Sequence, residues 1–241
     1  MSEIAEKYHV SLDDLIAANS NVSPNSMSVG QTLLIPSNPS NPDNASTPTP
    51  VPASVKQIQC YPTVDRGLWC FALVHNDFPD ILENVSAQVI LVDSNGTVVA
   101  SQTALLPLNI LPPNTSLPLY IFFEPEISSD VKAQVQLLTA IQIASNDSRY
   151  LPATINNTSI QIDRTGHSAQ ISGQVSIPSE SSAATQVWIA AVAYDENGRV
   201  VGVKRWEGGA IESGGNFPFN FAVASVGPKI DKIELVVEAR P

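Results

Sequence analysis

Residues 92–99 read Val-Asp-Ser-Asn-Gly-Thr-Val-Val, and residues 194–201 read Tyr-Asp-Glu-Asn-Gly-Arg-Val-Val, which is an offset of 102 residues. In both stretches an Asn-Gly pair lies between short runs that are typical of strands. Asn-Gly is the strongest short-range signal for a β-hairpin, because both residues tolerate positive φ. The chain is therefore predicted to form two similar hairpins in two different parts of its length.

Other short stretches repeat in the same order at similar offsets. They are Asp65–Arg66 with Asp163–Arg164, Leu117–Leu119 with Phe217–Phe219, and Val135–Leu137 with Ile233–Leu235. Each match alone is a generic strand or turn, so chance similarity is the alternative. The regular strand and turn spacing is typical of immunoglobulin-like sandwiches. We predict a mostly β fold with two tandem Ig-like β-sandwich domains, at residues 56–149 and 150–241.

The segment before these domains differs from them in composition. Residues 37–55 read SNPSNPDNASTPTPVPASV, which is rich in Pro, Ser, Thr and Asn. Such a segment cannot bury apolar surface, and its prolines favour an extended polyproline II conformation. We predict that residues 37–55 form a semi-rigid linker.

The charge of the chain excludes several classes of partner. Its 12 Lys and Arg against 23 Asp and Glu give a net charge of −11. Nucleic acids and anionic lipid surfaces both require clustered basic residues, so neither is an expected partner. No run approaches the about 18 apolar residues that a membrane-spanning helix needs. Met1–Lys7 also lack the basic start and apolar middle of a signal peptide.

Residues 1–36 show a short helical pattern. Ser2–His9 and Ser11–Asn19 have apolar residues at helical spacing, and Ser2 and Ser11 are candidate N-caps. Gln31–Ile35 has the composition of a strand, and Pro36 ends it. We predict two short helices followed by a strand.

The stretch SEIAEKYHVSLDDLIAANSNVSPNSMSVGQTLLIP, residues 2–36, resembles the lysin-motif (LysM) family. The resemblance implies a βααβ fold and binding of polymers that contain N-acetylglucosamine (GlcNAc), usually peptidoglycan. It also implies that the loop after the second helix contacts the glycan through amides, main-chain groups and apolar side chains. The candidate glycan-binding residues are Asn19, Asn21, Val22, Ser23, Pro24, Asn25 and Met27. The alternative is that Asn19 only caps the helix and that Asn21 and Asn25 only serve turns.

The stretch departs from the family pattern at its start. Met1-Ser2 stand where the family has the end of its first strand and turn. We expect an incomplete, truncated α+β module that lacks this strand and binds peptidoglycan weakly or not at all. Either the protein extends upstream, where an export signal would also lie, or the module is degraded; the first explanation is favoured.

The two β domains are more weakly similar to bacterial extracytoplasmic FxLYD or Ig-like modules. The resemblance rests on Leu91–Gly96 and Ala193–Gly198, and the first stretch departs from it with Val92 in place of a Tyr. It implies spacers or contact surfaces, with an unknown protein partner, rather than chemistry.

Cys60 and Cys70 are the two cysteines of the chain, and they flank a stretch that could turn between two strands. In an exported protein such a pair is expected to form a disulfide. The alternative is two buried thiols. Without a nearby His pattern, the pair does not predict a zinc site.

No catalytic, cofactor or metal motif occurs. His9, His75 and His167 lie in three different parts of the chain, and HExxH, G-x-S-x-G and Gly-rich phosphate loops are absent. Asp77, Asp80 and Glu83 miss the spacing of a calcium loop, so a solvated loop is favoured over a calcium or paired-carboxylate site.

We therefore expect a non-catalytic, extracytoplasmic bacterial protein, attached to the cell wall or secreted. Its LysM-like module would bind peptidoglycan or another GlcNAc-containing glycan and tether the two Ig-like domains. No cofactor is expected. The alternatives are an adhesin that binds a protein partner, or the accessory part of a cell-wall hydrolase whose catalytic domain lies elsewhere.

Overall fold

The computed structural model describes residues 4–5, 11–19, 22, 33–34, 53–125, 127–128 and 130–241. The chain divides into two units, residues 1–50 and 51–241, which are described separately. The described structure is mostly β, as the sequence predicted.

The first unit contains helix α2 (Leu12–Ala18). The Ser11 carbonyl accepts a hydrogen bond from the Leu15 N–H at 3.1 Å, which is the backbone geometry of an N-cap residue. Leu15 is fully buried, and Ala5, which is also helical, is 4% exposed. Leu15 and Ala5 are thus core residues of this unit, whereas Leu12, which also lies at helical spacing, is 38% exposed.

The second unit begins with seven antiparallel strands. They are β1 (Ser54–Pro62), β2 (Leu68–His75), β3 (Ile81–Val92), β4 (Val98–Leu105), β5 (Ile110–Leu111), β6 (Ser116–Phe123) and β7 (Lys132–Ile143). Their order in the sheet is β1-β2-β6-β4-β3-β5, and β7 pairs with β3. β4 and β6 pair at a single position, Leu105 and Tyr120, so the sheet divides there into the layers β1-β2-β6 and β4-β3-β7. Strand β1 starts within the stretch that was expected to be linker; residues 37–52 lie outside the described residues.

Six further strands complete the unit. They are β8 (Thr154–Ile162), β9 (Ser168–Ser176), β10 (Gln186–Tyr194), β11 (Val200–Gly208), β12 (Asn216–Ala224) and β13 (Lys232–Arg240). They form two sheets of order β12-β9-β8 and β11-β10-β13. In the first seven strands, β1-β2-β6 corresponds to β8-β9-β12, and β4-β3-β7 corresponds to β11-β10-β13. β1, β2, β6 and β7 each begin 100 residues before their counterparts, so Val135 corresponds to Leu235 rather than to Ile233.

The two Asn-Gly stretches form the β3–β4 and β10–β11 turns. Only the glycines adopt positive φ, 82° at Gly96 and 71° at Gly198. Each glycine N–H donates to the carbonyl of the Asp three residues before it, Asp93 or Asp195. The pairing register shifts beside each turn, so these are bulged turns rather than two-residue turns with two positive φ values.

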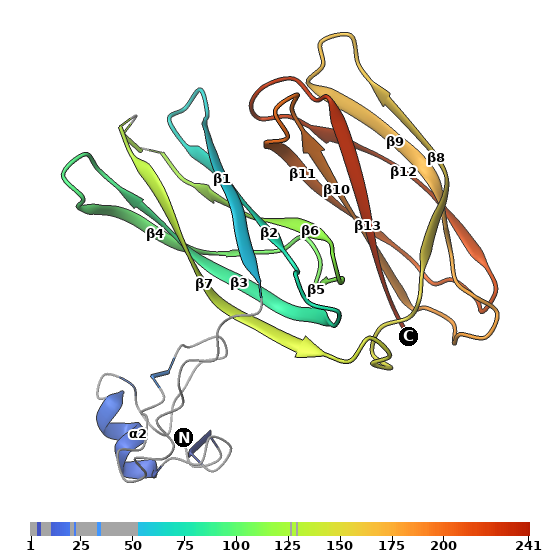
Figure 1. Ribbon diagram of the computed structural model, residues 1–241, viewed down its shortest axis with the longest axis horizontal. Coiled ribbons are helices and arrows are strands. Elements are labelled where there is room, and N and C mark those ends of the chain that lie inside the picture. The colour runs from blue at the N-terminus through green and yellow to red at the C-terminus, as the bar shows by residue number, and fades with distance from the viewer. Residues whose placement is uncertain are drawn as a thin grey trace. The chain divides into compact units, whose positions relative to one another are not determined.

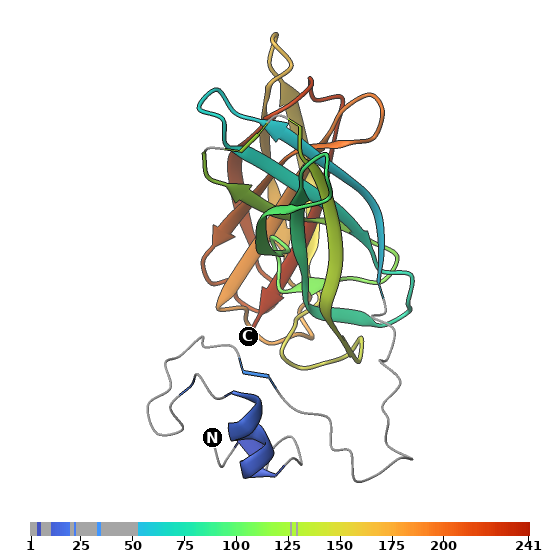
Figure 2. The same cartoon turned by 90° about the vertical axis from the view of Figure 1, so that its left-hand side faces the viewer.

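The unit has a first half, strands β1–β7, and a second half, strands β8–β13 (Figure 1). Strand β10 is buried on both faces, and its contacts join the two halves. One face packs in the core of the second half, through Val187, Ile189, Ala191 and Ala193. The other face packs with the core of the first half, through Ala190, Val192 and Tyr194. Figure 2 views the molecule with the first half in front of the second. The long apolar run of β10 thus reflects contact on two sides rather than one.

A buried carboxylate also joins the two halves. Glu238 of β13 is 2% exposed. Its carboxylate accepts hydrogen bonds from the Asn109 N–H at 2.7 Å, the Asn109 side-chain amide at 2.9 Å and the Arg240 guanidinium at 2.8 Å. On another part of the same interface, the Gln57 amide donates to the Gly198 carbonyl at 2.8 Å. Polar bonds therefore fix the relative position of the two halves.

Candidate functional site

In the LysM-like unit, the Asn19 side chain connects the end of α2 to a distant segment. Its amide nitrogen donates to the carbonyls of Leu15 at 2.8 Å and Leu34 at 2.6 Å. Its amide oxygen accepts from the Leu34 N–H at 2.7 Å. Asn19 is 4% exposed. Because both amide hydrogens are used inside the protein, this side chain has no donor left for a sugar.

Of the strand that was expected over Gln31–Ile35, only Leu33 and Leu34 lie within the described residues. Leu33 and Leu34 are not assigned to a strand. The backbone N–H and carbonyl of Leu34 pair with the Asn19 amide, which imitates a neighbouring strand's peptide group. The sequence pattern showed the apolar character of this segment but not the partner of its backbone.

Val22 is the other candidate glycan-binding residue in the described part of the chain. It is 8% exposed, and its N–H donates to the Asn19 carbonyl at 2.9 Å. Val22 and Asn19 thus shape the start of the loop from inside. The remaining candidates, Asn21, Ser23, Pro24, Asn25 and Met27, lie outside the described residues.

Cys60 and Cys70 are directly opposite one another in the β1–β2 ladder, with their Cα atoms 4.1 Å apart. The structure joins them by a disulfide. Cys70 is 1% exposed, and both residues pack with the core of the first half. The disulfide therefore closes the hairpin from inside the sandwich.

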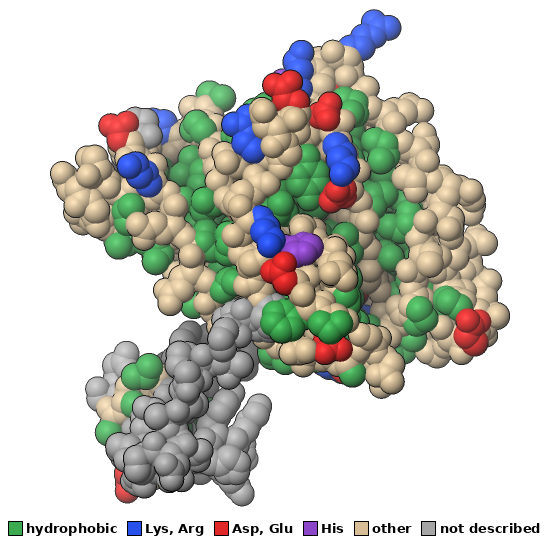
Figure 3. Space-filling view, in the orientation of Figure 1, with side chains coloured by type: hydrophobic (Ala, Val, Ile, Leu, Met, Phe, Trp, Pro, Cys, Tyr) green, Lys and Arg blue, Asp and Glu red, His purple; other side chains and the backbone are tan. Residues whose placement is uncertain are grey.

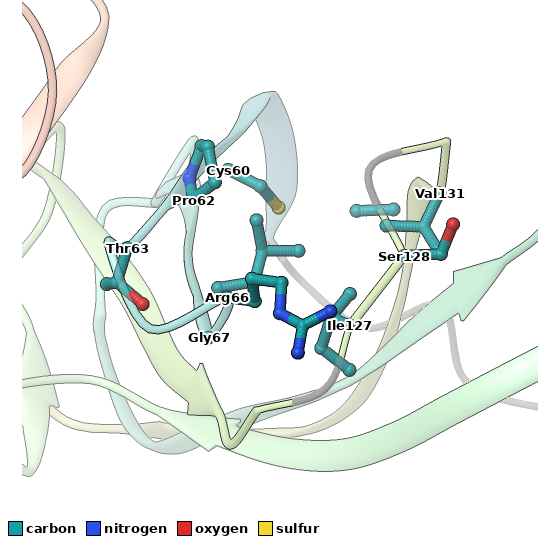
Figure 4. Close-up of a pocket in the computed structure, with 10 residues that line it drawn as sticks. Cys60, Pro62, Thr63, Arg66, Gly67, Ile127, Ser128 and Val131 are labelled. Atoms are coloured by element: carbon teal, nitrogen blue, oxygen red, sulfur yellow. The ribbon is translucent and has the colours of Figure 1, made fainter.

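A cavity of about 420 Å³ opens beside this disulfide (Figure 4). It lies between the β1–β2 turn and the segment that connects β6 to β7. Its lining residues are Cys60, Pro62, Thr63, Arg66, Gly67, Leu68, Ile127, Ser128, Val131 and Ala133. The wall is mainly apolar, and among the described residues that line it Arg66 has the one charged side chain. The sequence gives no sign of this site, because its residues come from separate strands and loops.

The structure does not bring Asp77, Asp80 and Glu83 together as one site. Glu83 belongs to β3, is 8% exposed, and accepts hydrogen bonds from Arg149 at 2.8 Å and the Tyr150 hydroxyl at 2.6 Å. This corrects the expectation of a solvated loop for Glu83. Asp77 instead bonds Ser54 and Lys56, and Asp80 bonds Gln142. Among the described residues no group of His, Cys, Asp and Glu could hold a metal ion.

The fold brings a Ser, a His and an Asp close together at the β2–β6 pairing, which the sequence alone does not indicate. His75 and Ser116 are opposite one another on β2 and β6, and Ser116 Oγ lies 2.9 Å from His75 Nδ1. Asp77 Oδ1 lies 3.6 Å from His75 Nε2, which is too long for a hydrogen bond. The Asp77 carboxylate is bound instead by Ser54 and Lys56. These residues are a cross-strand pair with a neighbouring ion pair, and they do not assemble a catalytic triad.

Comparison with known proteins identifies the first unit. Residues 1–36 match the family model of the LysM domain. LysM is a binding module, and its presence suggests binding of peptidoglycan or another GlcNAc-containing glycan. In the described part of the chain, no helix is both long and apolar enough to span a membrane.

No curated protein matches the chain. Among the solved structures, a crystal structure of red sea bream transglutaminase matches with 10% identity and a TM-score of 0.25, and the match covers 78% of this chain. The chain spans 29% of the length of that transglutaminase, and a likeness at this score carries no argument about activity.

Proposed function

We propose that this chain is a non-catalytic, extracytoplasmic glycan-binding protein. Its LysM segment binds a GlcNAc-containing glycan such as peptidoglycan and tethers residues 51–241 to the cell wall. The observation that carries the proposal is the match of residues 1–36 to the LysM domain. The Cys60–Cys70 disulfide supports it, because disulfides persist in oxidising compartments.

Within the LysM segment, we assign two different roles to the candidate residues. Asn19 and Val22 are buried, so they position the loop rather than touch the sugar. Asn21, Ser23, Pro24, Asn25 and Met27 are the proposed contacts, since amides and small apolar groups suit an acetamido sugar.

We propose that residues 51–241 act as a rigid spacer made of two Ig-like domains. The equal strand order in both halves supports a tandem arrangement, and the doubly buried β10 supports rigidity. Charged side chains are sparse and scattered on the face that Figure 3 shows. Such a surface suits a spacer better than a docking site for a charged polymer.

The proposal is tested by sedimentation of the full chain with insoluble peptidoglycan over a range of protein concentrations. Because the segment lacks the family's first strand, we expect only weak binding, seen as a small bound fraction at high protein concentration that a soluble GlcNAc oligomer removes by competition. Replacement of two proposed contact amides, Asn21→Ala with Asn25→Ala, is expected to weaken binding at least tenfold. The matched control is Asn146→Ala, because Asn146 is an exposed amide of the β unit.

Two results would overturn this proposal. The first is a bound fraction that GlcNAc oligomers do not reduce. The second is equal binding by the double variant and the control. Either result would place the contact with peptidoglycan outside Asn21 and Asn25.

A further inference from the structure

The cavity beside the disulfide has the size and composition of a small-molecule site. Its volume of about 420 Å³ falls within the range of ligand pockets. Leu68, Ile127, Val131 and Ala133 supply apolar wall from two strands and the β6–β7 connection. Leu68 is 8% exposed, so the wall is continuous with the core of the first half.

Arg66 is positioned at the mouth of this cavity. The Ile127 N–H donates to the Arg66 carbonyl at 3.1 Å, which fixes the turn against the opposite wall. Figure 4 shows the Arg66 side chain extending from the turn toward Ile127. The mouth is therefore framed by backbone bonding and contains one cationic side chain.

The Arg66 guanidinium has no hydrogen bond or ion pair with any residue in the described part of the chain. The neighbouring Asp65 accepts instead from the Thr63 hydroxyl, and this bond holds the pKa of Asp65 below its usual value. A guanidinium that is left unpaired beside an apolar wall is free to bind an anion in bidentate geometry.

The backbone of Arg66 is an independent sign of a special role. The φ of Arg66 is 67°. Among the described residues, the other non-glycine residues with positive φ are all Asn. The β3–β4, β8–β9 and β10–β11 turns place Gly96, Gly166 and Gly198 at the corresponding turn position. A long side chain is strained in this conformation, and such strain concentrates at functional sites.

We propose that this cavity binds an amphipathic monoanion, with an apolar chain between Leu68, Val131 and Ala133 and its carboxylate on the Arg66 guanidinium. The apolar wall buries the chain of the ligand, and the cationic side chain at the mouth orients its carboxylate. The net charge of −11 opposes general attraction of anions. Selection must therefore come from the cavity and Arg66 together.

The test is isothermal titration calorimetry of the full chain with decanoate below its micelle concentration. We expect saturable binding at one site, and at least tenfold weaker binding of decanol and decyltrimethylammonium. Arg66→Gln is expected to lose at least tenfold in affinity, and Arg66→Lys to retain part of it. The matched control Arg164→Gln, in the β8–β9 turn, is expected to bind as the native protein does.

Two variants separate this proposal from a loss of folding. Arg66→Gly removes the strain and is expected to raise the melting temperature while it abolishes decanoate binding. Ala133→Phe fills the cavity and is expected to abolish binding with Arg66 in place. Equal binding of decanoate and decanol, unchanged binding by Arg66→Gln, or unchanged binding by Ala133→Phe would each overturn the proposal.

Discussion

Two aspartates that look equivalent in the sequence have different surroundings in the structure. Asp93 and Asp195 both open a hairpin turn and accept hydrogen bonds from the N–H groups two and four residues later. The side chain of Asp195 is 1% exposed and also pairs with Arg199 at 2.7 Å. Burial alone would raise the pKa of Asp195, but the bonds from Arg199 and Asn197 hold it below its usual value.

We predict unequal costs for the removal of these two carboxylates. Asp195→Ala should lower the free energy of unfolding by about 2–4 kcal/mol, because it removes a buried carboxylate that accepts bonds from two part-buried N–H groups and from the Arg199 guanidinium. Asp93→Ala should cost about 1 kcal/mol, since water can replace its carboxylate. Urea unfolding of both variants checks this, and equal costs would contradict it.

The depressed pKa of Asp195 also predicts a dependence on pH. A carboxylate with a folded-state pKa below its unfolded value stabilises the fold above the unfolded pKa. This contribution is lost as the pH falls from the unfolded value through the folded one. Asp195→Ala should therefore lose less stability than the native protein as the pH falls below the unfolded-state pKa of an aspartate. Parallel loss of stability in both proteins, measured by urea midpoints, would count against this.

At the scale of elements, the β1–β2 hairpin depends on one covalent bond and one turn. The Cys60–Cys70 disulfide links the two strands, while the turn between them is strained by the positive φ of Arg66. Among the described strands, β1 pairs with β2 alone, since it lies at the edge of the sheet. The disulfide therefore compensates for the weak position of this strand.

We predict that loss of the disulfide lowers the free energy of unfolding by about 2–3 kcal/mol, because the unfolded chain regains the entropy of an open loop. The urea midpoint of the native protein with and without dithiothreitol measures this effect. The variant Cys60→Ala with Cys70→Ala serves as the control, because it should be insensitive to the reductant. A native midpoint that reductant leaves unchanged, with the disulfide shown to be reduced, would refute the prediction.

At the scale of the whole molecule, the two halves of residues 51–241 share a core. Ala190 and Val192 of the second half belong to the same cluster as Phe71 of the first half. Glu238 adds hydrogen bonds across the junction from a buried position. Neither half can lose its partner without exposing apolar surface.

We predict that residues 51–241 unfold in a single transition and that Glu238→Ala lowers the stability of both halves together. The cost should be about 3–5 kcal/mol, because Arg240 and the Asn109 N–H lose their buried acceptor. Glu207→Ala is the control, since Glu207 forms an exposed ion pair with Arg205 and should cost at most about 1 kcal/mol.

Hydrogen exchange read by mass spectrometry checks this prediction separately for β2 and β9. Coincident loss of protection in both strands is the expected result. Two separate transitions in the native protein would show that the halves are independent domains.

The sequence by itself determined the β class, the strand periodicity and the LysM match, because these depend on local composition and short-range spacing. Asn-Gly pairs and apolar alternation act within a few residues, so they can be read from the chain. Asn19 shows what local sequence patterns do not predict. Its helix-capping position was visible, but its bonds to Leu34 depend on a contact across fifteen residues of sequence.

Only the tertiary structure decided how the strands are used. The apolar run of β10 is visible in the sequence, but its composition does not say that both faces of the strand are covered, one by each half of the unit. Likewise Arg66 looks like an ordinary turn residue until the fold places it beside Ile127 and an apolar cavity. Both features arise from long-range packing, whose free energy depends on surfaces that no local stretch of sequence contains.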